Sequence, residues 1–208
     1  MATAIIVTPT SAPKRAQKIN VELRKGTIVL HNSGGAVSLA ALARALSSTA
    51  LQQAAPGEWL LTANLQIDPG AELLIAAPEV RWLKLRSDAK SFVWIKALGG
   101  TLRISNTKVT SWNPQARTVD NAHENGRSFV LARDGATMTI DSAEMSHLGY
   151  EANESYGVAW RLEGTQGAAN NSTFGYNFYG LYLYRAAGLT IRNNTVHHSI
   201  RYGIDPHT

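Results

Sequence analysis

The sequence predicts an all-β protein folded as a right-handed parallel β-helix, a solenoid of about 23 residues per coil, with an N-terminal capping α-helix. The first observation behind this prediction is a repeat of Tyr-Gly pairs, which begin at Tyr156, Tyr179 and Tyr202, 23 positions apart each time. The second is an Asn-Asn pair at Asn170 that recurs at the same spacing at Asn193. Two motifs that keep one spacing indicate stacked coils, with the asparagines forming a ladder in a turn.

The composition fits one β-rich domain. The chain has 208 residues, of which 17 are Gly and 44% are hydrophobic, enough to build a sizeable core. Its formal net charge of +5 favours polyanionic partners, but the absence of a dense Lys and Arg run argues against nucleic acid. There is no cysteine, which excludes disulfides and thiolate chemistry. No apolar stretch approaches the roughly 20 residues of a membrane span, and the N-terminal apolar run is too short for a signal peptide.

The predicted elements divide the chain into three parts. Residues 1–18 are predicted to be a flexible lead-in, and residues 19–56 an N-terminal strand followed by the capping helix. Ser38 stands where an N-cap is expected, and the helix ends before the stop signal Ala55-Pro56-Gly57. Residues 57–208 consist of short β-rich runs separated by turn residues, which predicts a β-helix that is incomplete at its C-terminal end.

Aligning the coils places two columns of side chains on the outer face of the β-helix, because alternate residues of a strand point to opposite sides. The first column contains Ala159, Tyr182 and Asp205, and the second contains Arg161, Tyr184 and His207. We expect Tyr182, Tyr184, Arg161 and Arg185 to bind an extended anionic sugar chain, since aromatic rings pack on sugar faces and guanidinium groups bind carboxylates. Ordinary solvated surface is the alternative interpretation of these side chains.

Residues 202–207, with the sequence Tyr-Gly-Ile-Asp-Pro-His, are the strongest candidate for a reactive site. Asp205 and His207 are two positions apart on a predicted strand, so both should face the same groove. A carboxylate there can orient the imidazole for work as a general base, and Tyr202 is the candidate for a matching acid. No metal site is predicted, because the neighbours in His197-His198 should point to opposite faces of a strand.

This segment resembles the mannuronan C-5-epimerases, whose hallmark is a Tyr-Gly-x-Asp-Pro-His stretch on a β-helix coil. The resemblance extends over about residues 36–208 and includes the helix followed by the run that starts at Gly57. Further matching segments are Ser111-Trp112-Asn113, Arg127-Ser128-Phe129 and His147-Leu148-Gly149-Tyr150 before Ser155-Tyr156-Gly157.

The resemblance implies conversion of β-D-mannuronate to α-L-guluronate in alginate, by removal of the proton on C-5 and reprotonation from the opposite face. On matching positions His207 would be the base, Asp205 would orient it, and Tyr202 would be the acid or its partner. The implied partner is an anionic polysaccharide, and the implied protein is a periplasmic or extracellular monomer without membrane insertion and without a cofactor, calcium being left open. In the family further coils follow the histidine, so we expect a C-terminally truncated fragment, whose own activity stays open.

Two alternatives to the epimerase remain at this point. A polyuronate lyase shares the proton abstraction, and a non-catalytic carbohydrate-binding β-helix would use the same outer columns without turnover. A β-helix of the copper-protein accessory type ranks below both, because the chain has only 3 Met and no clustered ligand set. The first proton acceptor, His207 or Tyr202, is likewise open.

Overall fold

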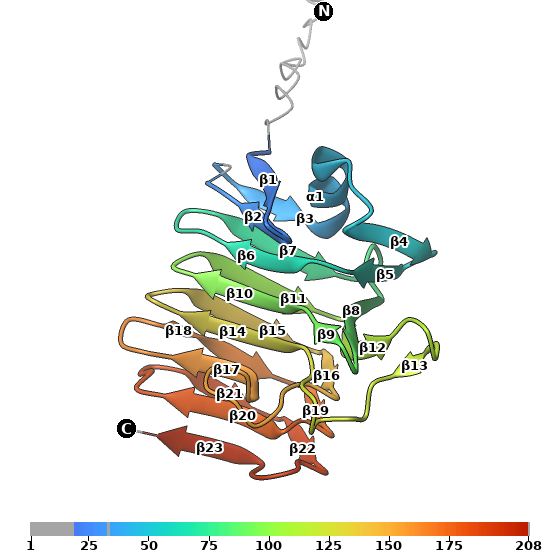
Figure 1. The fold of residues 1–208 in the computed structure, drawn as a ribbon. Coiled ribbons are helices and arrows are strands. Elements are labelled where there is room, and N and C mark those ends of the chain that lie inside the picture. Colours follow the sequence, from blue (N-terminus) through green and yellow to red (C-terminus); the bar gives the residue numbers. More distant parts are fainter. Residues whose placement is uncertain (1–18, 33, 208) are drawn as a thin grey trace, which may run out of the picture.

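The polypeptide winds into a solenoid whose walls are three β-sheets, here called A, B and C (Figure 1). The structure, a computed structural model, describes residues 19–32 and 34–207. The predicted lead-in, residues 1–18, and Thr208 lie outside the described residues. Each turn of the chain adds one strand to A, then one to B and then one to C.

The strands of each sheet run in spatial order from one end of the solenoid to the other. Sheet A consists of β1 (Val21–Arg24), β2 (Thr27–Leu30), β6 (Asn64–Ile67), β10 (Trp94–Leu98), β14 (Phe129–Arg133), β17 (Gly157–Arg161), β20 (Tyr179–Tyr184) and β23 (Ile204–His207). Sheet B consists of β3 (Ala36–Ser38), β7 (Glu72–Ala76), β11 (Thr101–Ser105), β15 (Thr137–Asp141), β18 (Gln166–Asn170) and β21 (Thr190–Arg192). Sheet C consists of β4 (Leu51–Ala55), β5 (Glu58–Leu61), β8 (Trp82–Asp88), β12 (Lys108–Asn113), β16 (Glu144–Ser146), β19 (Thr173–Gly175) and β22 (Thr195–His197), with β9 (Ser91–Phe92) beside β8 and β13 (Thr118–Val119) beside β12.

Neighbouring strands from successive turns are parallel in all three sheets, for example β14 with β17 and β15 with β18. Antiparallel pairs occur at the N-terminal end, β1 with β2 and β4 with β5, and in the side hairpins of β9 and β13. This is the right-handed parallel β-helix that the sequence predicts, and the predicted fold class is confirmed.

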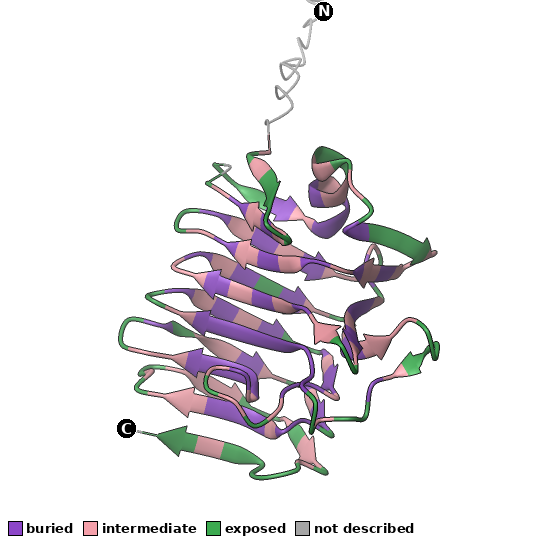
Figure 2. Ribbon diagram, viewed as in Figure 1, coloured by how far each residue is buried: buried purple, intermediate pink, exposed green. Residues whose placement is uncertain are grey.

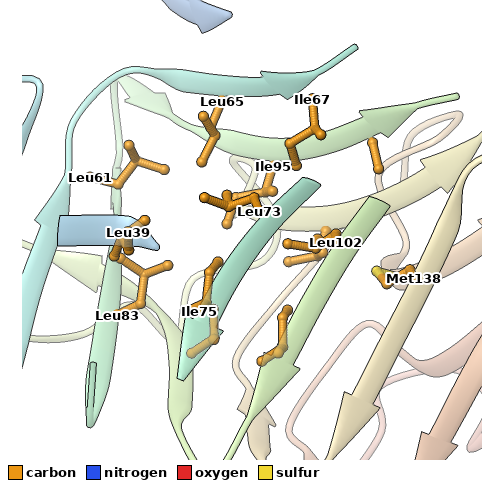
Figure 3. Packing of buried hydrophobic residues seen from close by; sticks show 14 of the residues in the cluster. Leu39, Leu61, Leu65, Ile67, Leu73, Ile75, Leu83, Ile95, Leu102 and Met138 are labelled. Atoms are coloured by element: carbon orange, nitrogen blue, oxygen red, sulfur yellow. The ribbon is translucent and has the colours of Figure 1, made fainter. Parts of the chain in front are cut away.

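Alternation of apolar and polar residues explains why these segments form the walls. In β6 and β7 every second residue is buried, so one side of each strand faces the interior (Figure 2). The interior is filled by aliphatic side chains from all three sheets, each of which contributes about 1.5–3 kcal/mol when fully buried. Figure 3 labels Leu65, Ile67 and Ile95 from sheet A, Leu73, Ile75, Leu102 and Met138 from sheet B, and Leu61 and Leu83 from sheet C.

The predicted capping helix is α1 (Leu39–Leu46), at the N-terminal end of the solenoid (Figure 1). The Ser38 hydroxyl accepts a hydrogen bond from the Ala41 N–H at 3.3 Å, as an N-cap does, and Leu39 and Leu42 are buried in the core. The helix ends earlier than the stop signal suggests, and β4 follows it as an additional strand. Residues 19–56 are not a separate unit, because β2 and β3 join the same sheets as the later coils.

The corner between sheets B and C has the same construction in four successive coils. It begins with a residue in the left-handed region, which asparagine adopts at a lower cost than most residues: Asn106, Ser142, Asn171 and Asn193 have φ of 51°, 52°, 52° and 54°. Asn193 Nδ2 donates to Asn171 Oδ1 at 3.3 Å, so a side-chain ladder is present. Its register corrects the prediction, since Asn193 lies beside the residue 22 positions earlier and not beside Asn170.

The 23-residue spacing holds in sheet A, and only for its last strands. Ala159 pairs with Tyr182 and Tyr182 with Asp205, whereas the pairs Trp94 with Phe129 and Val130 with Val158 belong to longer coils. A bulge in β20, where Gly180 and Leu181 lie opposite Val158 of β17, adds the extra position between Ala159 and Tyr182 relative to sheets B and C. The additional residues of the longer coils lie mainly at the corner between sheets C and A, where β9, β13 and residues 147–156 are found (Figure 1).

Candidate active site on sheet A

The predicted site residues lie on the last three strands of sheet A. Register pairing places Ala159, Tyr182 and Asp205 in one column and Arg161, Tyr184 and His207 in the next. Both columns point away from the buried core, as the repeat predicts. The glycines of the Tyr-Gly pairs also have a physical reason, since a Cβ on Gly180 would collide with the carbonyl oxygen of Gly203 in the following coil.

Asp205 and His207 lie together at the end of these columns. The His207 Nε2 atom is 3.2 Å from Asp205 Oδ2. The Asp205 side chain is only 13% exposed, whereas that of His207 is 54% exposed. A largely buried carboxylate beside an accessible imidazole can hold the ring in one orientation and stabilise its protonated form, as general base chemistry requires.

Tyr182 points outward but is covered, which corrects the expectation that it lies on an open face. It is 7% exposed and belongs to a second apolar cluster, outside the coil, with Phe129, Leu131 and Ala159. Its ring lies 4.6 Å from that of Tyr156 and 5.6 Å from that of His207. Burial raises the pKa of Tyr182, so its hydroxyl stays protonated at neutral pH. Strand alternation gives the side on which a residue lies, but not the segments that cover it.

The other predicted sugar-binding residues are placed differently. The Arg161 guanidinium lies 5.1 Å from the Tyr184 ring centroid, a cation–π distance, and its side chain is 12% exposed. Arg185 comes directly after β20 and has a left-handed backbone conformation, with φ 52°. Its guanidinium pairs with Glu163. Arg161 and Tyr184 therefore share the column that ends at His207, whereas Arg185 lies beyond the end of its strand.

Tyr202 lies at the corner that precedes β23, away from the Asp205–His207 pair. It is 56% exposed, and its ring is 5.7 Å from that of Tyr179. The ring of Tyr179 is in turn 5.5 Å from that of Tyr182, so two tyrosine rings stand between Tyr202 and His207. The structure thus brings Asp205 and His207 together and places Tyr202 at the opposite end of β23.

Three charged residues near these columns are not among those predicted from the sequence. Arg133 pairs with Arg161 in the register of β14 and β17, and it extends the second column by one strand. Lys96 belongs to the first column, opposite Leu131 on β14. Both basic groups, and Arg161, contact the carboxylate of Glu154, which lies in the segment between β16 and β17. The 23-residue repeat could not reveal this cluster, because the coils that supply it are longer.

A second group of side chains lies at the corner between sheets C and A. Tyr176 is stacked between His147 and His198, with ring centroids 4.8 Å and 4.9 Å away, beside a cavity of about 410 Å³. Burial, followed by the charges of Arg127 and Lys108, lowers the pKa of His147 to about 4. Arg127, buried in the same wall, has its pKa lowered to about 10 by burial.

The pair His197-His198 differs from the expectation. The two Nδ1 atoms are 2.9 Å apart, because His198 lies past the end of β22 in the left-handed region, with φ 51°, and does not continue the alternation of the strand. Within residues 19–32 and 34–207, no three His, Cys, Asp or Glu side chains gather as a metal site would require.

Comparison with known proteins finds similar sequences, although no family model matches the chain. The mannuronan C5-epimerase of Pseudomonas aeruginosa is 29% identical over 187 residues, which are 84% of this chain and 34% of that protein. The enzyme of the same name from Pseudomonas fluorescens is 33% identical over 172 residues, 76% of this chain and 31% of that protein. Over most of its length, the chain is similar to the mannuronan C5-epimerases. The resemblance stated from the motifs is confirmed.

The chain spans about a third of the length of the mannuronan C5-epimerases that it matches. Crystal structures of the periplasmic alginate epimerase AlgG share its fold. One has a TM-score of 0.73 at 22% identity, covering 81% of this chain and 41% of that one, and a single-substitution mutant has a TM-score of 0.79 at 20% identity, covering 99% and 59%. In the described part of the chain, no helix has the length and apolarity to cross a membrane.

Proposed function

We propose that the chain is the part of a mannuronan C5-epimerase that contains its Asp-Pro-His motif, and that it acts on β-D-mannuronate in alginate to form α-L-guluronate. The observation that carries this proposal is the pairing of Asp205 with an accessible His207 at the end of an outward column with Arg161 and Tyr184. The sequence similarity to mannuronan C5-epimerases supports the choice of substrate.

The reaction exchanges one C–H bond for another with inversion at C-5. The proton on C-5 is adjacent to the sugar carboxylate, and its removal requires a positioned base. With Nε2 of His207 directed at Asp205, Nδ1 is left to accept this proton, and the Asp205 carboxylate then stabilises the imidazolium. Delivery of a proton to the opposite face of C-5 completes the epimerisation, and Tyr202 is proposed as the acid or its partner.

Arg161 is proposed to bind a neighbouring sugar. Strands of one sheet are about 4.8 Å apart, and Arg161 lies two strands from His207, so the two residues are separated by roughly 10 Å. This distance suits the carboxylate of another residue of the polymer, while Tyr184 between them offers part of its ring to a sugar face. Tyr182 and Arg185 are retained as predicted contacts with the polymer.

The proposed partner of the protein is an anionic polysaccharide, the proposed location is periplasmic or extracellular, and the proposed state is a monomer. No cofactor enters the proton transfers described above, and a requirement for calcium is left to measurement.

The complete gene product, incubated with polymannuronate and followed by proton NMR, tests the proposal. We expect guluronate to form, and His207→Ala to lower its rate by at least about 10²-fold while folding is retained. His198→Asn, an exposed histidine at a left-handed position, is the matched control and should leave the rate unchanged. Unsaturated sugar ends would identify a lyase instead. Binding without either product would leave a carbohydrate-binding β-helix.

A further inference from the structure

We propose that the Glu154 carboxylate occupies a carboxylate-binding site on sheet A, formed by Lys96, Arg133 and Arg161, and that a sugar carboxylate of a polyuronate displaces it. The identity of the polymer rests on the proposed function, whereas the site itself rests on the contacts of Glu154.

Three basic side chains from three successive coils converge on this one carboxylate. Lys96 Nζ lies 3.5 Å from Glu154 Oε2, and Arg161 Nη1 lies 3.3 Å from Oε1. Arg133 Nη1 is also bonded to Oε1. Asn153, next to Glu154, accepts from Arg161 Nη1 at 3.2 Å. Cations on β10, β14 and β17 therefore share the Glu154 carboxylate, and Arg133 Nε also lies 2.9 Å from Asp134 Oδ2.

Lys96 and Arg161 also have contacts that do not involve Glu154. Lys96 Nζ lies 4.9 Å from the Trp94 ring centroid and 5.4 Å from that of Phe129, and Arg161 lies over Tyr184. The Lys96 and Arg161 side chains are 20% and 12% exposed. Grouped and poorly solvated cations require an anion nearby, because an unpaired charge at such a position is strongly disfavoured.

The anion comes from a loop and not from the sheet. Glu154 belongs to the connection between β16 and β17, and its φ of 68° lies in the left-handed region, which is unfavourable for glutamate. The loop is closed on itself by bonds from Tyr150 N to Ser155 O and from Ser155 N to Ala152 O. A side chain on such a loop can leave the site while the strands that hold the three cations keep their register.

A uronate carboxylate has the same charge and geometry as that of Glu154. The site is also aligned with the candidate active site, since Arg133, Arg161, Tyr184 and His207 occupy one register column on four neighbouring strands. A polymer lying across these strands would reach His207 with one sugar and the Glu154 position with another. Glu154 is therefore an internal competitor that lowers the affinity for polyuronate.

The test compares binding of polymannuronate and polygalacturonate to the chain and to two variants, by isothermal titration calorimetry. We expect Glu154→Gln to bind polyuronate about 3- to 10-fold more tightly, because the competing carboxylate is lost. Glu151→Gln is the matched control: Glu151 lies in the same loop, its side chain is 73% exposed, and it pairs at 3.4 Å with Arg201 and not with the three cations. Equal affinity of the two variants, or weaker binding by Glu154→Gln, would overturn the inference.

A second measurement needs no variant. Hydrogen exchange of residues 149–156 in the wild-type chain should become faster when polyuronate is added, because the loop is released. Unchanged or slower exchange at saturating polymer, or no binding of either polyuronate to any of the proteins, would also overturn the inference. The proposed function fails separately, if polyuronate releases the loop but the complete gene product forms no guluronate.

Discussion

The surroundings of His147 lower the pKa of its imidazole well below that of an ordinary histidine. Its imidazole is stacked on Tyr176 beside the charge of Arg127, and burial together with that charge keeps its pKa near 4. The folded protein therefore holds this histidine neutral at neutral pH, and protonation opposes folding. The surroundings of His207 are of another kind, since its side chain is 54% exposed and lies beside the Asp205 carboxylate.

We predict that His147 makes folding stability depend on pH below neutrality. Above pH 6.5 the residue is neutral in both states; between 6.5 and about 4 the unfolded chain binds a proton that the folded protein does not, so stability falls as pH falls. His147 has φ 58°, which asparagine tolerates, so His147→Asn should remove about 1 kcal/mol of the loss in stability between pH 7 and 5, after allowance for solvent screening. Urea denaturation at both pH values measures this. Parallel stability curves for the two proteins from pH 7.5 to 5 would contradict it.

The sequence predicts the column of each site residue but not its surroundings. Asp205, Tyr184 and Arg161 occupy the register positions expected from the repeat. Tyr182 does so too, but the rings of Tyr156 and Tyr179 cover it, and those contacts arise between coils. The contact of Glu154 with three cations depends on a loop conformation that periodicity does not encode.

At the scale of secondary structure elements, the corner between sheets B and C is the most regular feature. Its left-handed first residue turns the chain sharply, and the side chains of Asn171 and Asn193 bond to the same corner in a neighbouring coil. Asn171 Nδ2 donates to Asp141 Oδ1 at 3.0 Å, and Asn171 Oδ1 accepts from Asn193 Nδ2. This explains the asparagine repeat by backbone geometry together with side-chain bonding.

Substitutions of Asn171 should separate these two contributions. Asn171→Val places a β-branched residue at φ 52° and should lower the free energy of unfolding by about 1–2 kcal/mol or more, whereas Asn171→Gly loses only the side-chain bonds and should cost less. Thr173→Val, two positions later on β19, is the control for a β-branched residue in a strand. Urea denaturation measures all three. A smaller loss for valine than for glycine would show that backbone conformation does not govern this corner.

The register between neighbouring strands could be predicted only in part from the motif spacing. The motif spacing of 23 is a property of sheet A, where a bulge in β20 adds a position between Tyr179 and Tyr182. Just before this bulge the two strands approach closely, since a Cβ on Gly157 would lie 2.7 Å from the Tyr179 carbonyl oxygen. A repeat read from sequence averages over such bulges and cannot assign the extra residue to one sheet.

At the scale of the whole molecule, the fold gathers several of the positive charges on one sheet. The net charge of +5 belongs to a solenoid whose sheet A holds Lys96, Arg133 and Arg161 on one face. The fold class was predictable because the last coils repeat the same motifs. The bounds of the earlier coils were not predictable, because their lengths differ and the coils are defined only by which strands pair in the folded structure.

Binding of polymannuronate should therefore weaken as salt is added. Screening of partly exposed cations by ions at higher concentration should reduce affinity about tenfold or more between 50 mM and 500 mM NaCl. Calorimetric titration at several salt concentrations measures the effect, and neutral mannan is the control ligand. Affinity for polymannuronate that does not change with salt would show that binding depends on ring contacts and not on charge.

The corner between sheets C and A has a consequence for how such a protein can diversify. Insertions there leave the parallel pairing of the three sheets intact, as β9, β13 and residues 147–156 show. One of these insertions delivers Glu154 onto the face that carries the candidate site. Substrate preference can then evolve by exchange of loops at a single corner, while the three sheets of the solenoid stay unchanged.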